Sequence, residues 1–365
     1  MIIQLKNYIK NARGIKTDRK IIVFLVDDYG TIRISSNQAL EKLQLSDPKI
    51  SENRFNKYDA IANEDDLTAI FDVLTSVKDK NGNSAVFTPM TVVSNPNFAL
   101  IENNNFSEYK YETIIETFKQ KKDGDKIIEV WKEGIDKNIF VPEFHGREHL
   151  NVRFWMDYLK KNDKNVIEAF KHQSIGVHPS LKNSKGYMSA FDIENKSHLE
   201  EVIEVAKNGL EIFENLFGYK SILFTPSALI HNNGMHEELK KHSIELIDMA
   251  RQRIEPMLNG KYKKRFHYMG QKNKFDQKYI TRNVMFEPNK NEKDAVNQAL
   301  KDIDVAFKYN KPAVISSHRV NFVGGKTELN RENGLKDLKK LLNGIITRWP
   351  DAEFLTIRDL KNNIR

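Results

Sequence analysis

The sequence contains no cysteine. This absence excludes disulfide bonds, thiolate nucleophiles and thiolate-ligated metals, so any bound metal needs histidine and carboxylate ligands. The sequence also lacks any run that approaches the about 20 apolar residues of a membrane span. Residues 1–20 begin with a short apolar run and then scatter lysine and arginine among polar residues, which is the wrong order for a secretory signal. We therefore predict a cytoplasmic protein without a membrane span.

Dense clusters of positive charge are also scarce. The 365 residues carry a formal net charge of +8, but the lysines are spread along the chain, and the dense basic cluster with aromatic neighbours is Lys261–Arg265. We therefore predict no nucleic-acid partner, and the oligomeric state stays open. No linker rich in glycine, serine or proline divides the chain, so we expect an N-terminal extension at residues 1–19 and one domain at residues 20–365.

Short apolar segments alternate with amphipathic helical patterns. Strands are predicted at residues 21–26, 85–93, 139–141, 174–178, 221–226, 282–288, 313–318 and 353–357. Helices are predicted at residues 37–45, 65–80, 111–121, 126–134, 152–160, 165–172, 198–217, 237–251, 292–309 and 334–347. The alternation predicts a parallel α/β fold, and seven or eight units over this length favour a single β/α barrel over an open sheet. Polar segments at residues 97–110 and 181–196 are expected loop insertions.

Two adjacent acids follow the first predicted strand. Six apolar residues, Ile21–Val26, run directly into Asp27 and Asp28, which is typical of a strand buried on both faces. The acids then lie at the carboxyl end of the strand, where parallel α/β folds place their chemistry. Neighbouring side chains of an extended backbone point to opposite faces, so we expect one acid to hold a metal and the other to handle a proton. A role as helix caps stays open from these residues alone.

Three histidines are placed near the same end of the predicted sheet. His145 and His149 follow the strand at residues 139–141, and their spacing puts both imidazoles on one face of a helical turn, within reach of one cation. With one carboxylate they form a three-ligand set with an open position, as catalytic metal sites have. His318 ends the strand at residues 313–318, and a pKa near about 6.5 suits proton transfer. A hydrogen-bonded structural histidine is the alternative for His318.

The order of these motifs resembles that of the polysaccharide deacetylase family, within the wider glycoside hydrolase/deacetylase superfamily. The segment Val26–Gly30, Val-Asp-Asp-Tyr-Gly, stands where that family has Thr-Phe-Asp-Asp-Gly. It is also similar to the Ala-Asp-Asp-Phe-Gly segment of the chitooligosaccharide deacetylase branch. The resemblance extends from Val26 to about Leu360, and it implies a distorted (β/α) barrel of about seven parallel strands.

The resemblance also implies roles for the motif residues. Asp28 would bind one divalent metal ion, zinc or a near equivalent, together with His145 and His149. Asp27 would act as the general base and His318 as the general acid. The implied reaction is the metal-assisted hydrolysis of an N-linked or O-linked acetyl group on a carbohydrate or glycan precursor.

The sequence departs from the family pattern at two places. Gly146 stands where the family has serine or threonine, and Leu223–Pro226 lacks the arginine that orients the base. We propose Arg282 or Arg319 as its replacement. His178 is a possible fourth ligand or substrate contact, with a structural role equally open.

Further assignments are less specific. Tyr29 is a candidate for a sugar-binding cleft. We assign surface or structural roles to the remaining histidines, which are His172, His198, His231, His236, His242 and His267.

Two other functions compete with the deacetylase hypothesis. A glycosidase of the same superfamily would use two carboxylates across a cleft, and Glu287 is the candidate partner of Asp27. A barrel that binds glycans without catalysis is conceivable because of Gly146 and the missing arginine. Acetate release, or its absence, separates these possibilities.

Overall fold

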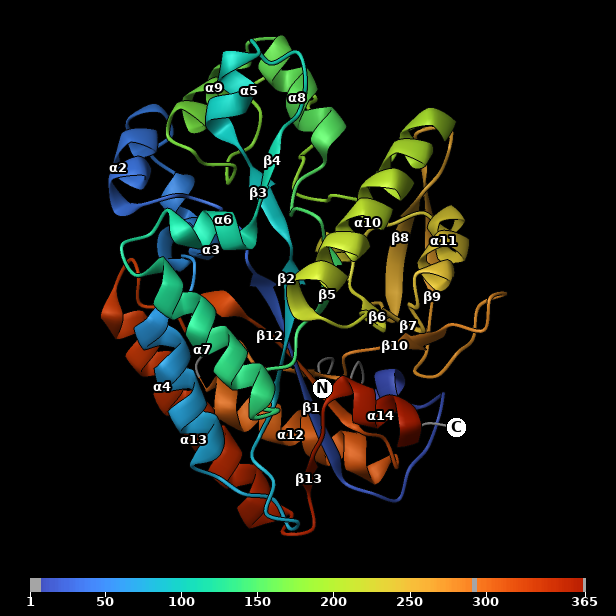
Figure 1. Ribbon diagram of the computed structural model, residues 1–365. Coiled ribbons are helices and arrows are strands. Elements are labelled where there is room, and N and C mark those ends of the chain that lie inside the picture. The colour runs from blue at the N-terminus through green and yellow to red at the C-terminus, as the bar shows by residue number, and fades with distance from the viewer. Residues whose placement is uncertain (1–7, 291–293, 364–365) are drawn as a thin grey trace.

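The computed structural model describes residues 8–290 and 294–363 and is built around one curled parallel sheet (Figure 1). Its strands follow the order β10-β7-β6-β5-β2-β1-β12-β11, and β13 also pairs with β1. Their bounds are β1 Ile21–Tyr29, β2 Phe87–Val92, β5 Glu143–Gly146, β6 Leu223–Phe224, β7 Leu246–Asp248, β10 Lys278–Ile280, β11 Val284–Met285, β12 Ala313–His318 and β13 Glu353–Phe354.

The two edge strands of this order are consecutive in the chain. β10 ends at Ile280 and β11 begins at Val284, so three residues connect one edge of the sheet to the other. β10 runs parallel to β7, and β11 runs parallel to β12. A single extended stretch therefore closes the sheet into a distorted barrel, which confirms the predicted fold class.

Strand β1 is buried on both faces, as its apolar run predicts. Every residue from Ile21 to Val26 is at most 1% exposed. Ile22, Phe24 and Val26 pack into the large cluster under the outer helices, whereas Ile21, Val23 and Leu25 face the barrel interior. Burying an aliphatic or aromatic side chain of this size contributes about 1.5–3 kcal/mol, so these six residues anchor the sheet.

Helices cover the outside of the barrel in three groups. The first group, α4 Glu64–Thr75, α7 Gly124–Asp136, α12 Ala295–Lys308 and α13 Glu328–Arg348, lies together in Figure 1 and packs on β1, β2 and β12. The second group, α10 Lys196–Phe217 and α11 His236–Lys241, packs on β5, β6 and β7. The third group, α5 Phe98–Asn103, α8 Val152–Lys160 and α9 Lys164–Lys171, forms a separate cluster at the top of Figure 1.

Short elements complete the described chain. The helices are α2 Asn37–Ser46, α3 Arg54–Tyr58, α6 Ile114–Lys119 and α14 Ile357–Asn363, with single 3-10 turns at Ile50–Glu52, Ser227–Leu229, Asn233–Met235 and Arg319–Asn321. Two antiparallel strand pairs stand outside the main sheet, β3 Ser94–Pro96 with β4 Tyr111–Thr113, and β8 Gln252–Pro256 with β9 Tyr262–Phe266. Most of the basic cluster lies on β9.

Several predicted elements were wrong. Residues 174–178 form no strand, because the backbone amides of Ile175 and Gly176 donate to the carbonyl of Arg33 instead of to a sheet. The helix predicted at residues 237–251 ends at Lys241, and Leu246–Asp248 forms β7. Ser243 has a φ of +71°, which a continuing helix does not allow.

Other boundaries shifted. Residues 111–113 form a strand before α6, and residues 139–141 contribute only one bridge, because the strand begins at Glu143. The last predicted strand ends at Phe354. The predicted start of α12 at Glu292 lies outside the described residues.

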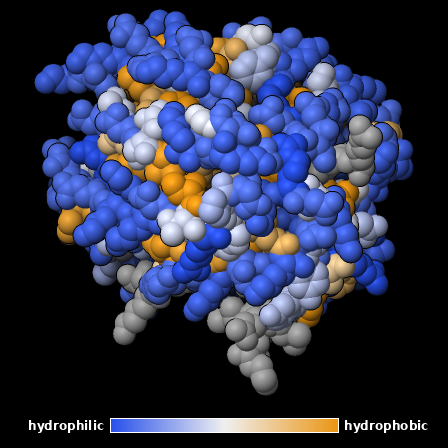
Figure 2. All heavy atoms as spheres, turned by 90° about the horizontal axis from the view of Figure 1, so that it is seen from below, coloured by the Kyte–Doolittle hydropathy of each residue, from blue (hydrophilic) through white to orange (hydrophobic). Residues whose placement is uncertain are grey.

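The segment before β1 lies against the barrel. The amide of Ile15 donates to the carbonyl of Met269, and Lys311 Nζ donates to the carbonyls of Gly14 and Ile15. No helix among the described residues is long and apolar enough to cross a membrane. The face seen in Figure 2 is mostly hydrophilic, with hydrophobic residues in small groups, in keeping with dispersed charge.

Candidate active site

The site begins where β1 ends. Asp27 pairs in register with His318 of β12, so the parallel ladder itself puts these two side chains side by side. Asp28 has a φ of +74°, and the pairing of β1 with β2 shifts register between Val26 and Tyr29. Such a bulge re-aims side chains. Asp27 and Asp28 therefore both line one cavity, and the expectation that they point to opposite faces was wrong.

Three buried side chains converge at the first half of the site. Asp28 Oδ1 lies 3.5 Å from His145 Nε2 and 3.3 Å from His149 Nε2, and the three candidate ligand atoms lie within 4.8 Å of one another. His145 is on β5 and His149 is in the loop that follows, so the predicted helical turn was wrong although the pairing of the two imidazoles was right. Strand and loop bring them together instead.

The contacts of this group suit a cation. His145 Nδ1 lies 2.7 Å from the carbonyl of Thr225 and donates to it, so Nε2 is the ring nitrogen that faces Asp28. His145 Nε2 is buried without a hydrogen-bond partner among the described residues. Burial lowers the pKa of His149. Burial alone would raise the pKa of Asp28, but the contacts with the two imidazoles outweigh this effect and hold the pKa well below its usual range. Two imidazole nitrogens and a carboxylate are ligands that a divalent metal takes, so the residues fit the ion.

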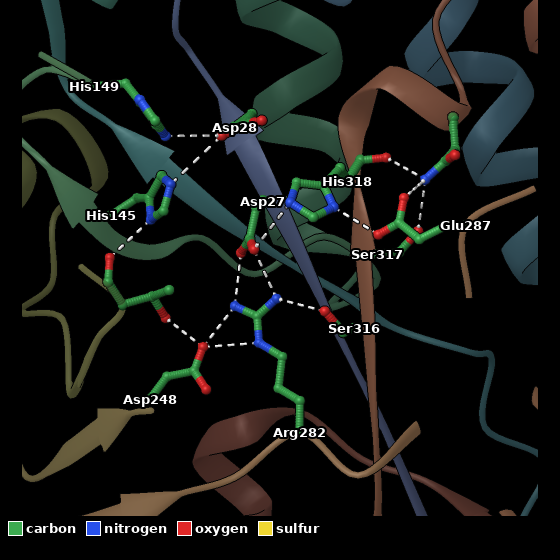
Figure 3. A network of polar contacts seen from close by, with 12 residues as sticks. Asp27, Asp28, His145, His149, Asp248, Arg282, Glu287, Ser316, Ser317 and His318 are labelled. Atoms are coloured by element: carbon green, nitrogen blue, oxygen red, sulfur yellow. Dashed lines mark hydrogen bonds and ion pairs between the residues drawn. The ribbon is translucent and has the colours of Figure 1, made fainter. Parts of the chain in front are cut away.

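Asp27 is held by an arginine from the joint between β10 and β11. Arg282 Nη1 and Nη2 donate to the two carboxylate oxygens of Asp27, each at 2.7 Å (Figure 3). Arg282 Nε donates to Asp248 Oδ2 at 2.7 Å. Thr225 Oγ1 donates to the same oxygen of Asp248 at 3.0 Å, and the Thr225 carbonyl accepts from His145. One chain of polar contacts therefore links the candidate base to a candidate metal ligand.

His318 faces the site from the other side. Its Nε2 lies 3.7 Å from Asp27 Oδ2, and its Nδ1 lies 2.6 Å from Glu287 Oε1 (Figure 3). Glu287 Oε2 accepts from Arg54 at 2.6 Å and from Asn321 at 2.8 Å, which fixes the carboxylate. Burial lowers the pKa of His318, but Glu287 and Asp27 raise it, and the net pKa lies above the ordinary histidine value. His318 is thus set up to carry a proton.

A cavity of about 600 Å³ opens onto these groups. Six of the predicted site residues line it, namely Asp27, Asp28, His145, His149, Arg282 and His318. Its volume is in the usual range for a pocket that binds a small molecule.

Four predicted candidates lie elsewhere. Tyr29 is fully buried in the core with its ring edge-on to Trp131 and Phe140, so it cannot contact a sugar. His178 is exposed in a loop, where its Nδ1 lies 3.0 Å from the carbonyl of Pro179.

The other two candidates have structural partners. Arg319 is buried against Asp59 and does not contact Asp27, so it is not the replacement arginine. Glu287 lies behind His318 rather than in the cavity wall.

Sequence reasoning missed most residues of the cavity wall, among them Asp248, Arg33 and Phe55. Asp248 was assigned to a helix, although Ile244–Asp248 shows a mainly apolar run that ends in an acid, the same signal as in β1. Arg33 and Phe55 lie in a bend and a short helix after β1, where no periodic pattern marks them.

The fold and site together define a distorted β/α barrel with a buried Asp-His-His group at its mouth. No protein-family model and no curated protein sequence matches this chain. Solved structures similar to this chain include deacetylases. They include a probable polysaccharide deacetylase from Pseudomonas aeruginosa PAO1, at 8% identity over 94% of this chain and 91% of that chain, with a TM-score of 0.46.

Two further structures illustrate the range of similar barrels. A peptidoglycan deacetylase, PdaC from Bacillus subtilis, is 9% identical over 94% of this chain and 91% of that chain, with a TM-score of 0.36. An alpha-amylase, AmyC from Thermotoga maritima, is 11% identical over 95% of this chain and 75% of that chain, with a TM-score of 0.47. At these identities the likeness concerns the fold alone.

Proposed function

We propose that this protein is a metal-dependent hydrolase that removes an acetyl group from a carbohydrate. The observation that supports the proposal is the meeting, in one cavity, of a buried Asp28-His145-His149 group with Asp27 and His318. A divalent cation bound there, with zinc as our first candidate, would polarise the acetyl carbonyl and lower the pKa of water.

Asp27 is the proposed general base. Arg282 binds both of its oxygens from one side, which fixes the plane of the carboxylate. A carboxylate has about four lone-pair sites, so two remain for the proton of an attacking water. Asp28 contacts the two imidazoles instead. The two acids therefore have separate proposed tasks, as the resemblance to the deacetylase family implies.

His318 is the proposed general acid. Its raised pKa favours the protonated form, and Nε2 faces the cavity while Nδ1 is held by Glu287. An amine is a poor leaving group unless it is protonated as the bond breaks, so a positioned imidazolium supplies what amide hydrolysis needs. The alcohol of an ester is a better leaving group than an amine, so hydrolysis of an O-acetyl group would depend less on His318.

The glycosidase alternative has weaker support. It needs two carboxylates that face each other across the substrate. Both oxygens of Glu287 are engaged, one by His318 and the other by Arg54 and Asn321. A carboxylate engaged in this way has little freedom to attack or protonate a glycosidic bond.

The test is acetate release from a panel of N-acetylated and O-acetylated sugars, before and after chelation. We expect release that chelation abolishes and a divalent metal restores, and we expect a His145→Ala/His149→Ala variant to lose both metal and activity. A His172→Ala/His242→Ala variant is the matched control, because each of these histidines lies near a surface glutamate. Unchanged metal content in the first variant would contradict the proposal. New reducing ends without acetate would favour the glycosidase, and binding without release would favour the non-catalytic barrel.

A further inference from the structure

Arg33 is a cation of the cavity wall without a matching partner. Its side chain is only 11% exposed, and its nearest carboxylate oxygen, Asp28 Oδ2, lies 3.8 Å from Nη2, beyond hydrogen-bond range. Its Nε is buried and has no hydrogen-bond partner within the described parts of the chain. By contrast, Arg54, Arg282 and Arg319 each donate two or more hydrogen bonds to oxygens of the protein. A buried guanidinium with unused donors is uncommon, and it needs an explanation.

The surrounding chain holds Arg33 in place. The amides of Ile175 and Gly176 donate to its carbonyl at 2.8 and 2.9 Å. A Cβ on Gly176 would lie 2.7 Å from Arg33 Cγ, so the stem of the side chain packs closely on that glycine. The guanidinium carbon lies 4.7 Å from the centre of the Phe55 ring. Arg33 is therefore a fixed donor group, and a fixed group loses little freedom when it binds a ligand.

The cavity wall also carries an excess of positive charge. Lys10, Arg33, Arg251 and Arg282 line it together with three carboxylates, those of Asp27, Asp28 and Asp248. Arg282 is shared between Asp27 and Asp248. Asp28 Oδ2 lies 3.8 Å from Arg33, so the four cations of the wall outnumber its three carboxylates by one. A concave site lined by one sign of charge attracts ligands of the other sign.

We infer that the substrate carries an anionic group, a carboxylate or a phosphate, close to its acetyl group, and that Arg33 binds this anion. The planar fork of arginine matches the oxygens of both anions and can donate two parallel hydrogen bonds. Because Arg33 lies beside Asp28, the anion sits on the acetylated sugar or its neighbour. Lys10 and Arg251 add to the attraction. This inference rests on the proposed function, since it names the kind of sugar that the same site takes.

Three matched compounds test the inference: N-acetylglucosamine, its 6-carboxylate (N-acetylglucosaminuronic acid) and its 6-phosphate. We expect kcat/KM at least about tenfold higher for one of the anions than for the neutral sugar, because charge-assisted hydrogen bonds are strong. The preferred anion distinguishes carboxylate from phosphate. Arg33→Gln should lower kcat/KM for that anion by about tenfold more than it lowers kcat/KM for the neutral sugar, while Arg33→Lys should retain part of the preference.

The control is Arg348→Gln, which removes one charge from the exposed end of α13, away from the cavity wall. It should leave all three kcat/KM values unchanged. The inference is overturned if the wild-type protein has the same kcat/KM for the neutral sugar as for both anions. It is also overturned if Arg33→Gln reduces all three substrates equally, since Arg33 would then act on the reaction itself.

A binding measurement separates this inference from the proposed function. Calorimetric titration of the Asp27→Asn variant with the same three compounds reads affinity without turnover. Suppose that the wild-type protein releases acetate from none of the compounds. If an anion still binds at least about tenfold more tightly than the neutral sugar, and Arg33→Gln removes this difference, the proposed reaction is wrong and the anion site is supported. Equal affinities overturn the anion site, whatever the activity. The advantage should also shrink at high ionic strength, because salt screens charges.

Discussion

At the scale of single residues, the site separates charges that would otherwise repel. Asp27 and Asp28 are neighbours in sequence, yet Asp27 is bound by Arg282 and Asp28 by two imidazoles. Asp248 takes the other side of the Arg282 guanidinium. Each carboxylate therefore lies against a guanidinium or an imidazole, with Arg282 shared between Asp27 and Asp248, which offsets the cost of burying them.

The pH dependence of the proposed reaction should be governed by the pair His318 and Glu287. Burial lowers the pKa of His318 and Glu287 raises it, with a net increase. His318 must be protonated to act as an acid, so activity is lost as pH rises through its pKa. Glu287→Gln removes the charge that raises this pKa, and we expect the upper limb of the kcat/KM profile to move to lower pH. The profile of kcat/KM against pH, which reports groups of the free enzyme, is the measurement.

The control for this prediction is Glu238→Gln. Glu238 lies 3.4 Å from His242 on the surface, so it repeats the glutamate-histidine pair outside the site. Its profile should match that of the wild type. An upper limb that stays in place in Glu287→Gln would show that His318 is not the group that titrates.

At the scale of elements, the turn after β5 depends on glycine. Gly146 has a φ of +142°, which other residues rarely adopt, and a Cβ there would lie 3.1 Å from the Glu148 carbonyl. This explains why serine or threonine is absent at this position. Gly146 lies between the two histidines of the metal group, so the turn sets their separation.

We expect Gly146→Ala to weaken metal binding as well as stability. Strain of about 1–3 kcal/mol must be relieved by movement of the turn that carries His145 and His149. Gly218→Ala is the matched control, since Gly218 also has a positive φ, of +74°, but its Cβ would meet nothing within 4 Å. Both variants should lower Tm, whereas only Gly146→Ala should raise the Kd for zinc. Equal zinc affinities in the two variants would contradict the role assigned to this turn.

Elements with a strong local signal were predicted from sequence. The apolar run of β1 and the long amphipathic helix α10 are written in consecutive residues, so no knowledge of their neighbours is needed. β6 and β11 were predicted with longer bounds than they have, whereas β10, of three residues, was missed because its extended state depends on a partner far away in the chain. β7 was lost because its apolar residues also fit a helical period.

The candidate site shows the same limit. Asp27, Asp28, His145, His149 and His318 were found because each motif follows a predicted strand. Arg33 has no such signal. It stands out only because its Nε lacks a hydrogen-bond partner within the described parts of the chain, which a sequence cannot show. Arg282 was proposed only as one of two substitutes, and contacts across 255 residues were needed to distinguish it from Arg319.

At the scale of the whole molecule, buried histidines make the fold sensitive to acid. Burial lowers the pKa of His198 to about 4, of His236 to about 3 and of His267 to about 4. A histidine whose pKa is lower in the folded state adds no penalty above its unfolded pKa. It destabilises the fold as pH falls below about 6.5, by at most about 1.4 kcal/mol per pH unit.

We therefore expect the free energy of unfolding to fall between pH 6.5 and pH 5. His198→Leu tests one group alone, because both ring nitrogens of His198 are buried and have no hydrogen-bond partner among residues 8–290 and 294–363. The variant should show a shallower dependence on pH, by up to one proton, in urea denaturation followed at several pH values. A slope identical to that of the wild type would mean that His198 is not neutral in the folded protein.

The position of β1 at the centre of the sheet has a consequence for synthesis of the chain. The ribosome makes β1 early, and its neighbour β2 follows soon after, but β12 and β13 emerge only after most of the chain. The chain is synthesised at about 5–20 residues per second, so one hydrogen-bonding edge of β1 stays unpaired for many seconds. An open apolar edge is a site for wrong pairing between chains. The nascent protein should therefore depend on chaperones more than the mostly hydrophilic face in Figure 2 suggests.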